Sequence, residues 1–358
     1  MAGILCVIRI ATLVLAGTTA AQSAESGGLS RKPMTGPDES YPGVVATYDS
    51  LRDAAGQRLR LILTHPQASP EPVATIFVVG WLSCDSVAAP PGTRDAPQLV
   101  FQSLAQLPGF ATVRMDKPGT GDSEGDCSAT DFTTELTDYR AAFRSLHSYP
   151  FIDPKRIFIL GISNGGGFAP LVAEGAPVRG YVTDGGWLKT WFEHMMEIER
   201  RRLTLEGRAA ADINTAMKSV AALYSAYLIE GTAPQQIFAR QPALKDLWEG
   251  DAQHQYGRPV AYYQQLQQLN LMAAWSEVKV PTLVLHGEFD WIMSRSDLEL
   301  MTELVNRNLA GAATFAELPM TGHAFDHYAS MKAAFAGQAL PFDPSIARKV
   351  SDWFQQHR

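Results

Sequence analysis

The sequence has little cysteine, no concentration of basic charge and only one long apolar run. Its 358 residues include three cysteines, and acidic side chains outnumber basic ones by 37 to 30. Because the net charge is negative and no basic patch is evident, a nucleic-acid partner is not expected. No internal repeat is found, which disfavours a solenoid or propeller. Hydrophobic residues nonetheless make up 46% of the chain, so the composition is that of a globular protein with a large core.

The one long apolar run covers residues 4–16, with Arg9 as its only charge, and small residues follow it. The run is short for a bilayer span, and a short apolar segment followed by small residues is typical of a secretory signal peptide. We therefore expect residues 1–24 to be a signal peptide, with an uncleaved anchor as the alternative. The prediction is a secreted or periplasmic protein with no stable membrane anchor after cleavage. Residues 25–42, rich in Gly, Ser and Pro, are expected to form a flexible lead-in.

Two of the three cysteines lie outside the predicted signal peptide. Cys6 lies in the predicted signal peptide, which leaves Cys84 and Cys127 in the remaining chain. An even pair in an exported protein favours a disulfide. Two buried free thiols are the alternative.

Patterns of strands and helices alternate through most of the chain, which predicts an α/β fold with a mostly parallel sheet covered by helices on both faces. Between residues 187 and 277 only helical patterns occur, so we expect a helical cap there, inserted before the penultimate strand. The α/β core then consists of residues 43–186 and 278–358. The expected strands are 44–48, 59–64, 74–79, 111–115, 157–160, 180–183, 282–285 and 314–318, and the expected core helices are 99–107, 132–146, 298–309 and 344–356.

The chemistry of the chain centres on Gly161-Ile162-Ser163-Asn164-Gly165, which follows a run of apolar strand-forming residues. A nucleophilic serine must be exposed on a tight turn between a strand and a helix, and the glycines on either side leave room for that turn. The helix that follows presents its N–H groups to developing negative charge. We therefore expect Ser163 to be a catalytic nucleophile; an ordinary Gly/Ser turn is the alternative.

A serine nucleophile needs a base, and the base needs a carboxylate to orient it. In this architecture the chain order is serine, acid and histidine, each in a loop after a strand. The penultimate predicted strand runs into Glu288 and Asp290, and the last one runs into His323. We expect His323 to be the base and Asp290 to be the acid. The alternatives are His327 for the base and Glu288 or Asp184 for the acid.

An oxyanion formed at Ser163 needs two backbone donors. We expect one to be the N–H of Asn164, directly after the nucleophile, and the other to be that of Trp81, in the loop after strand 74–79. Three apolar side chains that open the predicted cap are candidates for binding substrate; their alternative role is packing between cap and core. They are Trp187, Trp191 and Met195.

These segments resemble the α/β-hydrolase superfamily over residues 44–357, apart from the cap. The resemblance lies in Gly161-Ile162-Ser163-Asn164-Gly165, His286-Gly287-Glu288-Phe289-Asp290 and Gly322-His323. The loop 116–125 is similar to that of the acyl esterase and X-prolyl dipeptidyl peptidase group, with Lys117-Pro118 where that group has Arg. The resemblance implies hydrolysis of an ester, amide or thioester without a cofactor.

Three other patterns carry less weight. Gly119-x-Gly121 follows a strand, but the next glycine is misplaced for a dinucleotide loop. His194 and Glu197 share a helix face, yet no third ligand is spaced for a zinc site, so no metal is expected. The charged run at residues 199–202 is expected to be a solvated helix face.

The sequence therefore predicts an exported serine hydrolase that cleaves carboxylic esters through an acyl-enzyme on Ser163. Its expected partner is a small-molecule ester, and no cofactor is expected. The alternative is a serine peptidase that acts on short or proline-containing peptides.

Overall fold

The structure is a computed structural model that describes residues 38–69 and 71–358. The predicted signal peptide and most of the predicted lead-in lie outside these residues. The main sheet is built from eight strands: β1 (Val44–Arg52), β2 (Arg58–Pro66), β3 (Val73–Val79), β4 (Phe110–Met115), β5 (Ile152–Ile162), β6 (Gly180–Asp184), β9 (Thr282–Gly287) and β10 (Ala313–Leu318).

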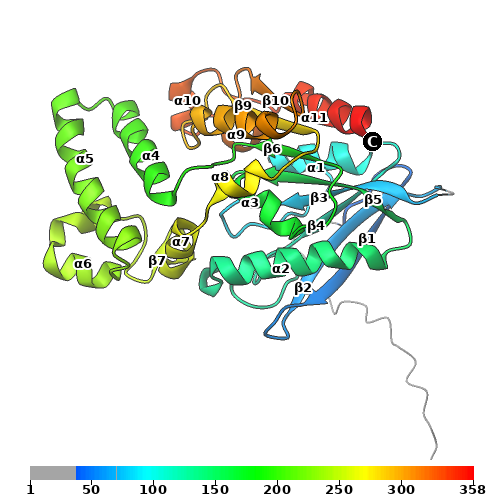
Figure 1. Ribbon diagram of the computed structural model, residues 1–358, viewed down its shortest axis with the longest axis horizontal. Helices are drawn as coiled ribbons and strands as arrows, with labels where there is room; N and C mark the ends of the chain where they lie inside the picture. Colours follow the sequence, from blue (N-terminus) through cyan, green and yellow to red (C-terminus); the bar gives the residue numbers. More distant parts are fainter. Residues whose placement is uncertain (1–37, 70) are drawn as a thin grey trace, which may run out of the picture.

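The strands are ordered β1-β2-β4-β3-β5-β6-β9-β10 across the sheet (Figure 1). β2 runs antiparallel to both of its neighbours, whereas every pair from β4 to β10 is parallel. The predicted mostly parallel sheet is thus confirmed. Each residue of β3 and β9 is buried, as expected for parallel strands that are covered on both faces.

Successive residues of β3 point to opposite faces of the sheet. Ile76 and Val78 join a hydrophobic cluster with two of the core helices, and Phe77 and Val79 join a second cluster with three others. The first pair is α1 (Ala96–Ala105) and α11 (Pro344–His357), and the second set is α2 (Phe132–Ser145), α3 (Asn164–Ala173) and α9 (Arg295–Asn308); the short α10 (Met331–Phe335) precedes α11.

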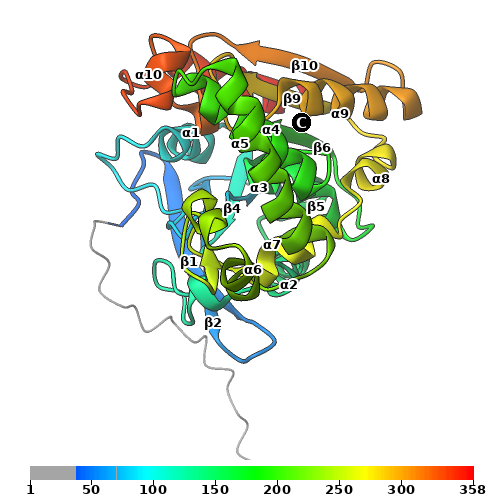
Figure 2. The ribbon, with the colours of Figure 1, turned by 90° about the vertical axis from the view of Figure 1, so that its left-hand side faces the viewer.

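The segment between β6 and β9 leaves the sheet and returns to it. In Figure 1 its helices between residues 191 and 267 lie to the left of the sheet, and in Figure 2 they lie in front of it. The prediction of helices alone was wrong in detail, because two short paired strands occur within the segment. Its elements are α4 (Trp191–Leu205), α5 (Ala210–Tyr224), α6 (Pro234–Arg240), β7 (His254–Gln255), β8 (Arg258–Pro259), α7 (Val260–Gln267) and α8 (Leu271–Ser276). This segment is called the insertion below.

The first helix of the insertion has a well-defined start. The Thr190 hydroxyl accepts a hydrogen bond from the N–H of Glu193, and the Glu193 carboxylate accepts one from the N–H of Thr190. This reciprocal pairing satisfies two N–H groups that a helix N-terminus leaves free. It fixes where α4 begins and therefore which of its residues face the sheet.

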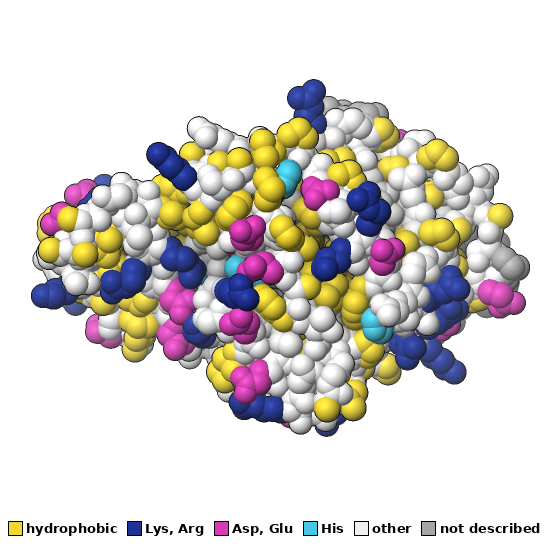
Figure 3. All heavy atoms as spheres, turned by 90° about the horizontal axis from the view of Figure 1, so that it is seen from above, with side chains coloured by type: hydrophobic (Ala, Val, Ile, Leu, Met, Phe, Trp, Pro, Cys, Tyr) yellow, Lys and Arg dark blue, Asp and Glu magenta, His cyan; other side chains and the backbone are white. Residues whose placement is uncertain are grey.

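The charges on the surface are mixed. On the face shown in Figure 3, acidic and basic side chains lie close to one another, with hydrophobic side chains between them. Of the helices within residues 38–69 and 71–358, none has the length and apolar character that a membrane span requires.

One carboxylate on α2 is buried without a partner. Asp138 is 1% exposed, and its Oδ2 atom has no hydrogen-bond partner among the described residues. Burial, together with the charges of Asp53 and Glu135, raises the pKa of Asp138 to about 7. Between about pH 4 and this value, the folded protein retains a proton that the unfolded chain has released. The free energy of unfolding therefore decreases as the pH rises through this window.

Replacing Asp138 by Asn removes the charge and retains the shape. At pH 8 we expect D138N to be more stable than the wild type by about 1–3 kcal/mol, since no unpaired carboxylate is then buried. At pH 5, where Asp138 is protonated, the two proteins should have similar stability. Urea unfolding at both pH values measures the difference. An equal difference at pH 5 and pH 8 would contradict the assignment.

Candidate active site

Ser163 lies on the turn between β5 and α3, with φ of 56°, a value that non-glycine residues seldom adopt. The glycines beside it are required by close contacts. A Cβ atom on Gly165 would lie 2.3 Å from the carbonyl oxygens of Val79 and Gly80, and one on Gly161 would lie 2.7 Å from that of Gly165. The turn therefore packs directly against the end of β3, which brings the following loop next to Ser163.

Three side chains predicted from the sequence meet at this turn. The Ser163 hydroxyl lies 2.7 Å from Nε2 of His323, and Nδ1 of His323 lies 2.9 Å from Oδ2 of Asp290. The other carboxylate oxygen of Asp290 accepts hydrogen bonds from the N–H groups of Ile292 and Met293, at 2.9 Å each. Since a carboxylate only accepts, Nδ1 carries the hydrogen and Nε2 is left to accept from the serine.

The electrostatics of the pair agree with this geometry. Burial alone would raise the pKa of Asp290, but the charge and hydrogen bond of His323 outweigh burial and hold that pKa below its ordinary value. Burial likewise would lower the pKa of His323, and the charge of Asp290 raises it above the ordinary value instead. Asp290 is thus ionised, and His323 is a stronger base than an isolated histidine.

The alternatives that the sequence left open lie elsewhere. The carboxylate of Glu288 accepts a hydrogen bond from the N–H of Met320, at 2.8 Å. Nδ1 of His327 faces the carbonyl oxygen of Pro341, at 3.1 Å. Neither side chain has a hydrogen bond to the Ser163 relay.

Asp184, the third alternative, lies close to the relay but is not part of it. Its side chain is buried, and Oδ2 has no hydrogen-bond partner among the described residues. Burial raises the pKa of Asp184 well above its ordinary value, and the nearby Asp290 adds to this despite the opposing charge of His323. Asp184 therefore holds its proton more strongly than an ordinary carboxyl group does. Its backbone carbonyl supports the turn by accepting the N–H of Ser163, at 2.8 Å.

Asn164 is held on both ends of its side-chain amide. Its Oδ1 accepts a hydrogen bond from Nε1 of Trp187, at 2.8 Å, and its Nδ2 donates to the Tyr262 hydroxyl, at 2.9 Å. As the first residue of α3, Asn164 has a backbone N–H without an acceptor inside the helix. This N–H is available to a ligand at Ser163.

The loop after β3 contains the second predicted donor, Trp81, whose indole stacks on Phe101 with ring centroids 6.1 Å apart. The preceding N–H, that of Gly80, is already used, since it donates to the Tyr139 hydroxyl at 3.1 Å. Within the described part of the chain no acceptor is found for the N–H groups of Trp81 and Leu82. Both residues line the same cleft as Ser163.

The cleft lies between the ends of the strands and the insertion and has a volume of about 730 Å³. Two of the candidates for binding substrate, Trp191 and Met195, line it. Trp187 does not: it is buried beneath the turn, where its indole bonds Asn164 and packs against Gly167. The walls are formed by aromatic and apolar residues from both the core and the insertion, including Trp81, Leu82, Trp191, Met195, Ile198, Trp291, Ile292 and Met293.

His194 is a lining residue that sequence reasoning did not assign to the site. Its side chain is buried in α4 and has no hydrogen bond within the described residues, and its ring lies 4.6 Å from that of Trp191. Burial lowers the pKa of His194 to about 3, so the imidazole is neutral. The sequence analysis considered His194 only as a possible zinc ligand together with Glu197. No group of three or more metal-ligating side chains is found among the described residues.

The charged run at residues 199–202 is not the solvated face that the sequence suggested. Glu199 is buried, lines the cleft and pairs with Arg202 at 2.7 Å. Arg201 donates to the carbonyl oxygens of Trp291 and Ile292, in the loop that also contains Asp290. Only Arg200 is exposed. The sequence could not reveal the contacts of Arg201, because Trp291 and Ile292 lie about 90 positions away.

The predicted disulfide is present between Cys84 and Cys127, whose Cα atoms are 5.8 Å apart. Cys84 follows β3 and Cys127 follows the loop after β4, so the bond joins loops after two neighbouring strands. In the chain-entropy model a loop of this length is stabilised by about 4 kcal/mol. The bond thus restrains the loop that contains Trp81.

Comparison with known proteins gives a consistent result. A family model described as the alpha/beta hydrolase family matches residues 76–338. A search of curated proteins finds no match to the sequence. The chain is similar in structure to Est1E of Butyrivibrio proteoclasticus with ferulic acid bound, at a TM-score of 0.54 and 16% identity over 87% of this chain and 99% of that one. It is also similar to an esterase of Pyrococcus furiosus (TM-score 0.52, 13% identity, 90% of this chain and 98% of that one) and to a protein described as a dipeptidyl aminopeptidase IV of Bacteroides ovatus (TM-score 0.51, 12% identity, 87% of this chain and 36% of that one). At these levels of identity the similarity shows the fold alone.

The assignment of Asp290 as the partner of His323 can be tested directly. In D290N the carboxylate that raises the pKa of His323 is absent, so we expect the pKa of His323 to decrease. NMR titration of the His323 ring measures it. E288Q, in which a neighbouring carboxylate is removed, is the control and should leave the pKa of His323 unchanged. An equal decrease in both variants, or none in D290N, would contradict the assignment.

Proposed function

The chain belongs to the alpha/beta hydrolase family, and we propose that it is an exported serine hydrolase that cleaves carboxylic esters through an acyl-enzyme on Ser163. The observation that supports this most strongly is the continuous hydrogen-bonded relay from Ser163 through His323 to Asp290. Export is supported by the Cys84–Cys127 disulfide, because such bonds persist in oxidising compartments.

In the proposed acylation step, the Ser163 oxygen attacks the carbonyl carbon of the ester while its proton moves to Nε2 of His323. Asp290 keeps the ring in the required tautomer and stabilises the imidazolium that forms. His323 then gives the proton to the departing alcohol oxygen, which leaves the acyl group on Ser163. A water molecule that loses a proton to His323 then attacks the acyl-enzyme. His323 returns this proton to the Ser163 oxygen as the bond between that oxygen and the acyl carbon breaks, and the acid is released.

In both steps a tetrahedral intermediate forms with negative charge on the former carbonyl oxygen. We assign the N–H groups of Asn164 and Trp81 as its donors. Both N–H groups lack other acceptors among the described residues, and the positive end of the α3 dipole adds to the effect. Each such donor contributes a factor of about 10²–10³ to the rate.

The cleft supports a small-molecule substrate with an aromatic or branched apolar half. Trp191 and Met195 provide apolar contact, and the neutral His194 offers a hydrogen bond beside them. A cleft of about 730 Å³ falls in the range that small-molecule sites occupy. Est1E, which is similar in structure to this chain, has ferulic acid bound.

A second candidate is a serine peptidase that acts on short or proline-containing peptides. One observation favours it: carboxylates outnumber basic groups around the cleft, where an α-amino group of a peptide would be attracted. The acidic residues lining the cleft are Asp85, Asp95, Glu199, Glu249 and Asp326, and the basic one is Arg202. The two candidates share the chemistry at Ser163 and differ in the leaving group.

We expect a fluorophosphonate probe to label the wild type at Ser163. Ser163→Ala should not be labelled, and its kcat for p-nitrophenyl esters should decrease by a factor on the order of 10⁶, because the attacking oxygen is absent. Ser148→Ala, at an exposed position after α2, is the matched control and should react like the wild type. The labelled residue is identified by mass spectrometry of the digested protein.

Equal labelling of the wild type and Ser163→Ala would rule out the proposal. For the choice of substrate, we expect kcat/KM to be larger for p-nitrophenyl esters than for aminoacyl or prolyl p-nitroanilides. Ester hydrolysis is the chemically easier reaction, so the comparison uses esters and anilides that share one acyl group. Anilide turnover equal to or faster than ester turnover would favour the peptidase.

A further inference from the structure

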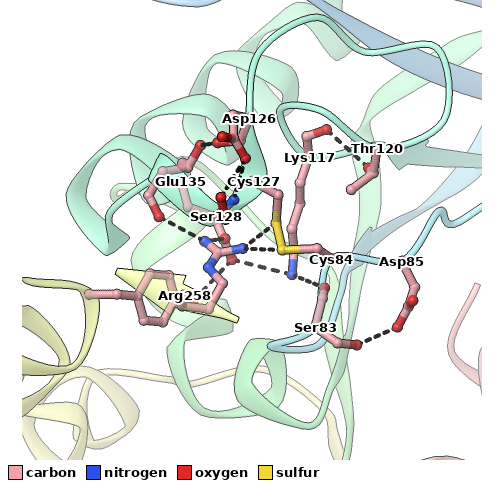
Figure 4. The surroundings of a disulfide bond; sticks show 12 residues. Ser83, Cys84, Asp85, Lys117, Thr120, Asp126, Cys127, Ser128, Glu135 and Arg258 are labelled. Carbon is pink, nitrogen blue, oxygen red and sulfur yellow. Dashed lines mark hydrogen bonds and ion pairs between the residues drawn. A yellow bond between two sulfur atoms is a disulfide. The ribbon is translucent and has the colours of Figure 1, made fainter. Parts of the chain in front are cut away.

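Lys117 is a buried lysine in the loop after β4 that reaches across to the loop after β3 (Figure 4). Its side chain is 3% exposed. Its Nζ donates hydrogen bonds to the carbonyl oxygen of Trp81 and, at 3.0 Å, to that of Ser83. The carboxylate of Glu135, on α2, lies 3.8 Å from Nζ. A buried ammonium group is costly in free energy unless it is hydrogen-bonded and paired. The contacts of Lys117 meet this requirement, and two of them are made to the loop that contains Trp81.

Through these bonds the segment 80–84 is held at four points. The N–H of Gly80 donates to the Tyr139 hydroxyl. Lys117 holds two carbonyl oxygens, and the disulfide fixes Cys84. The bonds lie on both sides of the Trp81 N–H, which is itself left without an acceptor in the described part of the chain. The direction of that N–H is therefore set by contacts outside the cleft.

Glu135 connects the same group to the other proposed donor. Its Oε2 accepts a hydrogen bond from Arg258 of the insertion, and its Oε1 accepts one from the Tyr262 hydroxyl, at 3.2 Å. That hydroxyl accepts a hydrogen bond from the side chain of Asn164. One buried carboxylate thus contacts Lys117, which holds the Trp81 loop, and Tyr262, which holds Asn164.

Arg258 also binds the disulfide. Its Nη1 lies 2.8 Å from Sγ of Cys127, and its Nη2 lies 3.2 Å from the carbonyl oxygen of Thr130. Figure 4 shows the guanidinium between Glu135 and the two sulfur atoms. The insertion therefore contributes to the support of the loops next to Ser163 as well as to the wall of the cleft.

The backbone of Lys117 is itself fixed. The preceding residue, Asp116, and Asp122 both pair with the buried Arg60 of β2. Gly119 has φ of 73°, and a Cβ atom there would lie 2.9 Å from the carbonyl oxygen of Gly125. The loop is thus folded tightly on itself, and Lys117 extends from a rigid base.

We propose that Lys117 is a positioning residue of the oxyanion hole: together with Glu135 it holds the segment 80–84 so that the Trp81 N–H faces the carbonyl oxygen of a substrate on Ser163. This rests on the proposed function. Lys117 does not line the cleft and touches no reacting atom. Its effect is on geometry, where a displacement of about 1 Å reduces a rate by about 10²-fold.

The charge of Lys117 should matter at alkaline pH. Burial lowers its pKa to about 8; Glu135 and Asp85 oppose this decrease, and Arg258 adds to it. Above that pH the neutral amine holds the two carbonyl oxygens more weakly than the ammonium does, because charge-assisted hydrogen bonds are about twice as strong.

Lys117→Met tests the proposal, with Lys189→Met as the matched control, since Lys189 also pairs with two carboxylates, those of Glu197 and Asp297, but away from the Trp81 loop. For Lys117→Met we expect kcat for p-nitrophenyl butyrate to decrease about 10- to 100-fold, with KM within about twofold of the wild type. The affinity for a trifluoromethyl ketone, which forms a tetrahedral oxyanion on the serine, should decrease by the same factor. Lys189→Met should change none of these quantities.

A folded Lys117→Met with kcat within twofold of the wild type would overturn the inference, as would an increase in KM alone. If either result is obtained while the wild type is still labelled at Ser163 by the fluorophosphonate probe, the proposed function stands and only the inference fails. Should Lys117→Met not fold, Lys117→Arg decides, because its guanidinium does not titrate below pH 12. We then expect kcat to decrease above about pH 8 in the wild type but not in Lys117→Arg. The same pH profile in both proteins, or a flat wild-type profile, would overturn the inference.

Discussion

The site depends on one close approach, that between the turn at Ser163 and the end of β3. β3 and β5 pair in parallel up to Val79 and Gly161, so both strands end at the same edge of the sheet. Gly165 lies against the carbonyl groups of Val79 and Gly80 with no room for a side chain. This contact holds Ser163 in a backbone conformation with positive φ and places the loop after β3 beside it. A side chain at Gly165 would separate the turn from the end of β3.

Buried ion pairs then hold the loops that follow β3 and β4 in defined positions. Arg60 holds the loop after β4, and Arg114 pairs with Glu39 beneath the loop after β3. Such pairs contribute little net stability, because desolvation offsets their attraction, whereas removing one partner leaves an uncompensated charge. Their consequence is a defined geometry rather than a large free energy. Glu135 and Lys117 belong to the same class, and the loops that they hold are those next to Ser163.

Much of this could be predicted from the sequence, because it depends on local pattern and chain order. Gly-x-Ser-x-Gly after an apolar run defined the turn, and the positions of Asp290 and His323 followed from the order of strands. Contacts between distant residues could not be predicted. Trp187 is buried beneath Asn164 rather than in the cleft, and Arg201 donates to two carbonyl oxygens in the loop that contains Asp290. The burial of His194, which keeps it neutral, likewise depends on how α4 packs against the core.

The most direct test is a crystal structure of the protein after reaction with a phosphonate ester. Its tetrahedral phosphorus imitates the intermediate, so the account predicts a covalent bond to Oγ of Ser163 and a phosphonyl oxygen about 2.7–3.1 Å from the backbone nitrogens of both Asn164 and Trp81. His323 should remain between the adduct and Asp290. A phosphonyl oxygen that points away from both nitrogens, or an adduct on a different residue, would contradict the account.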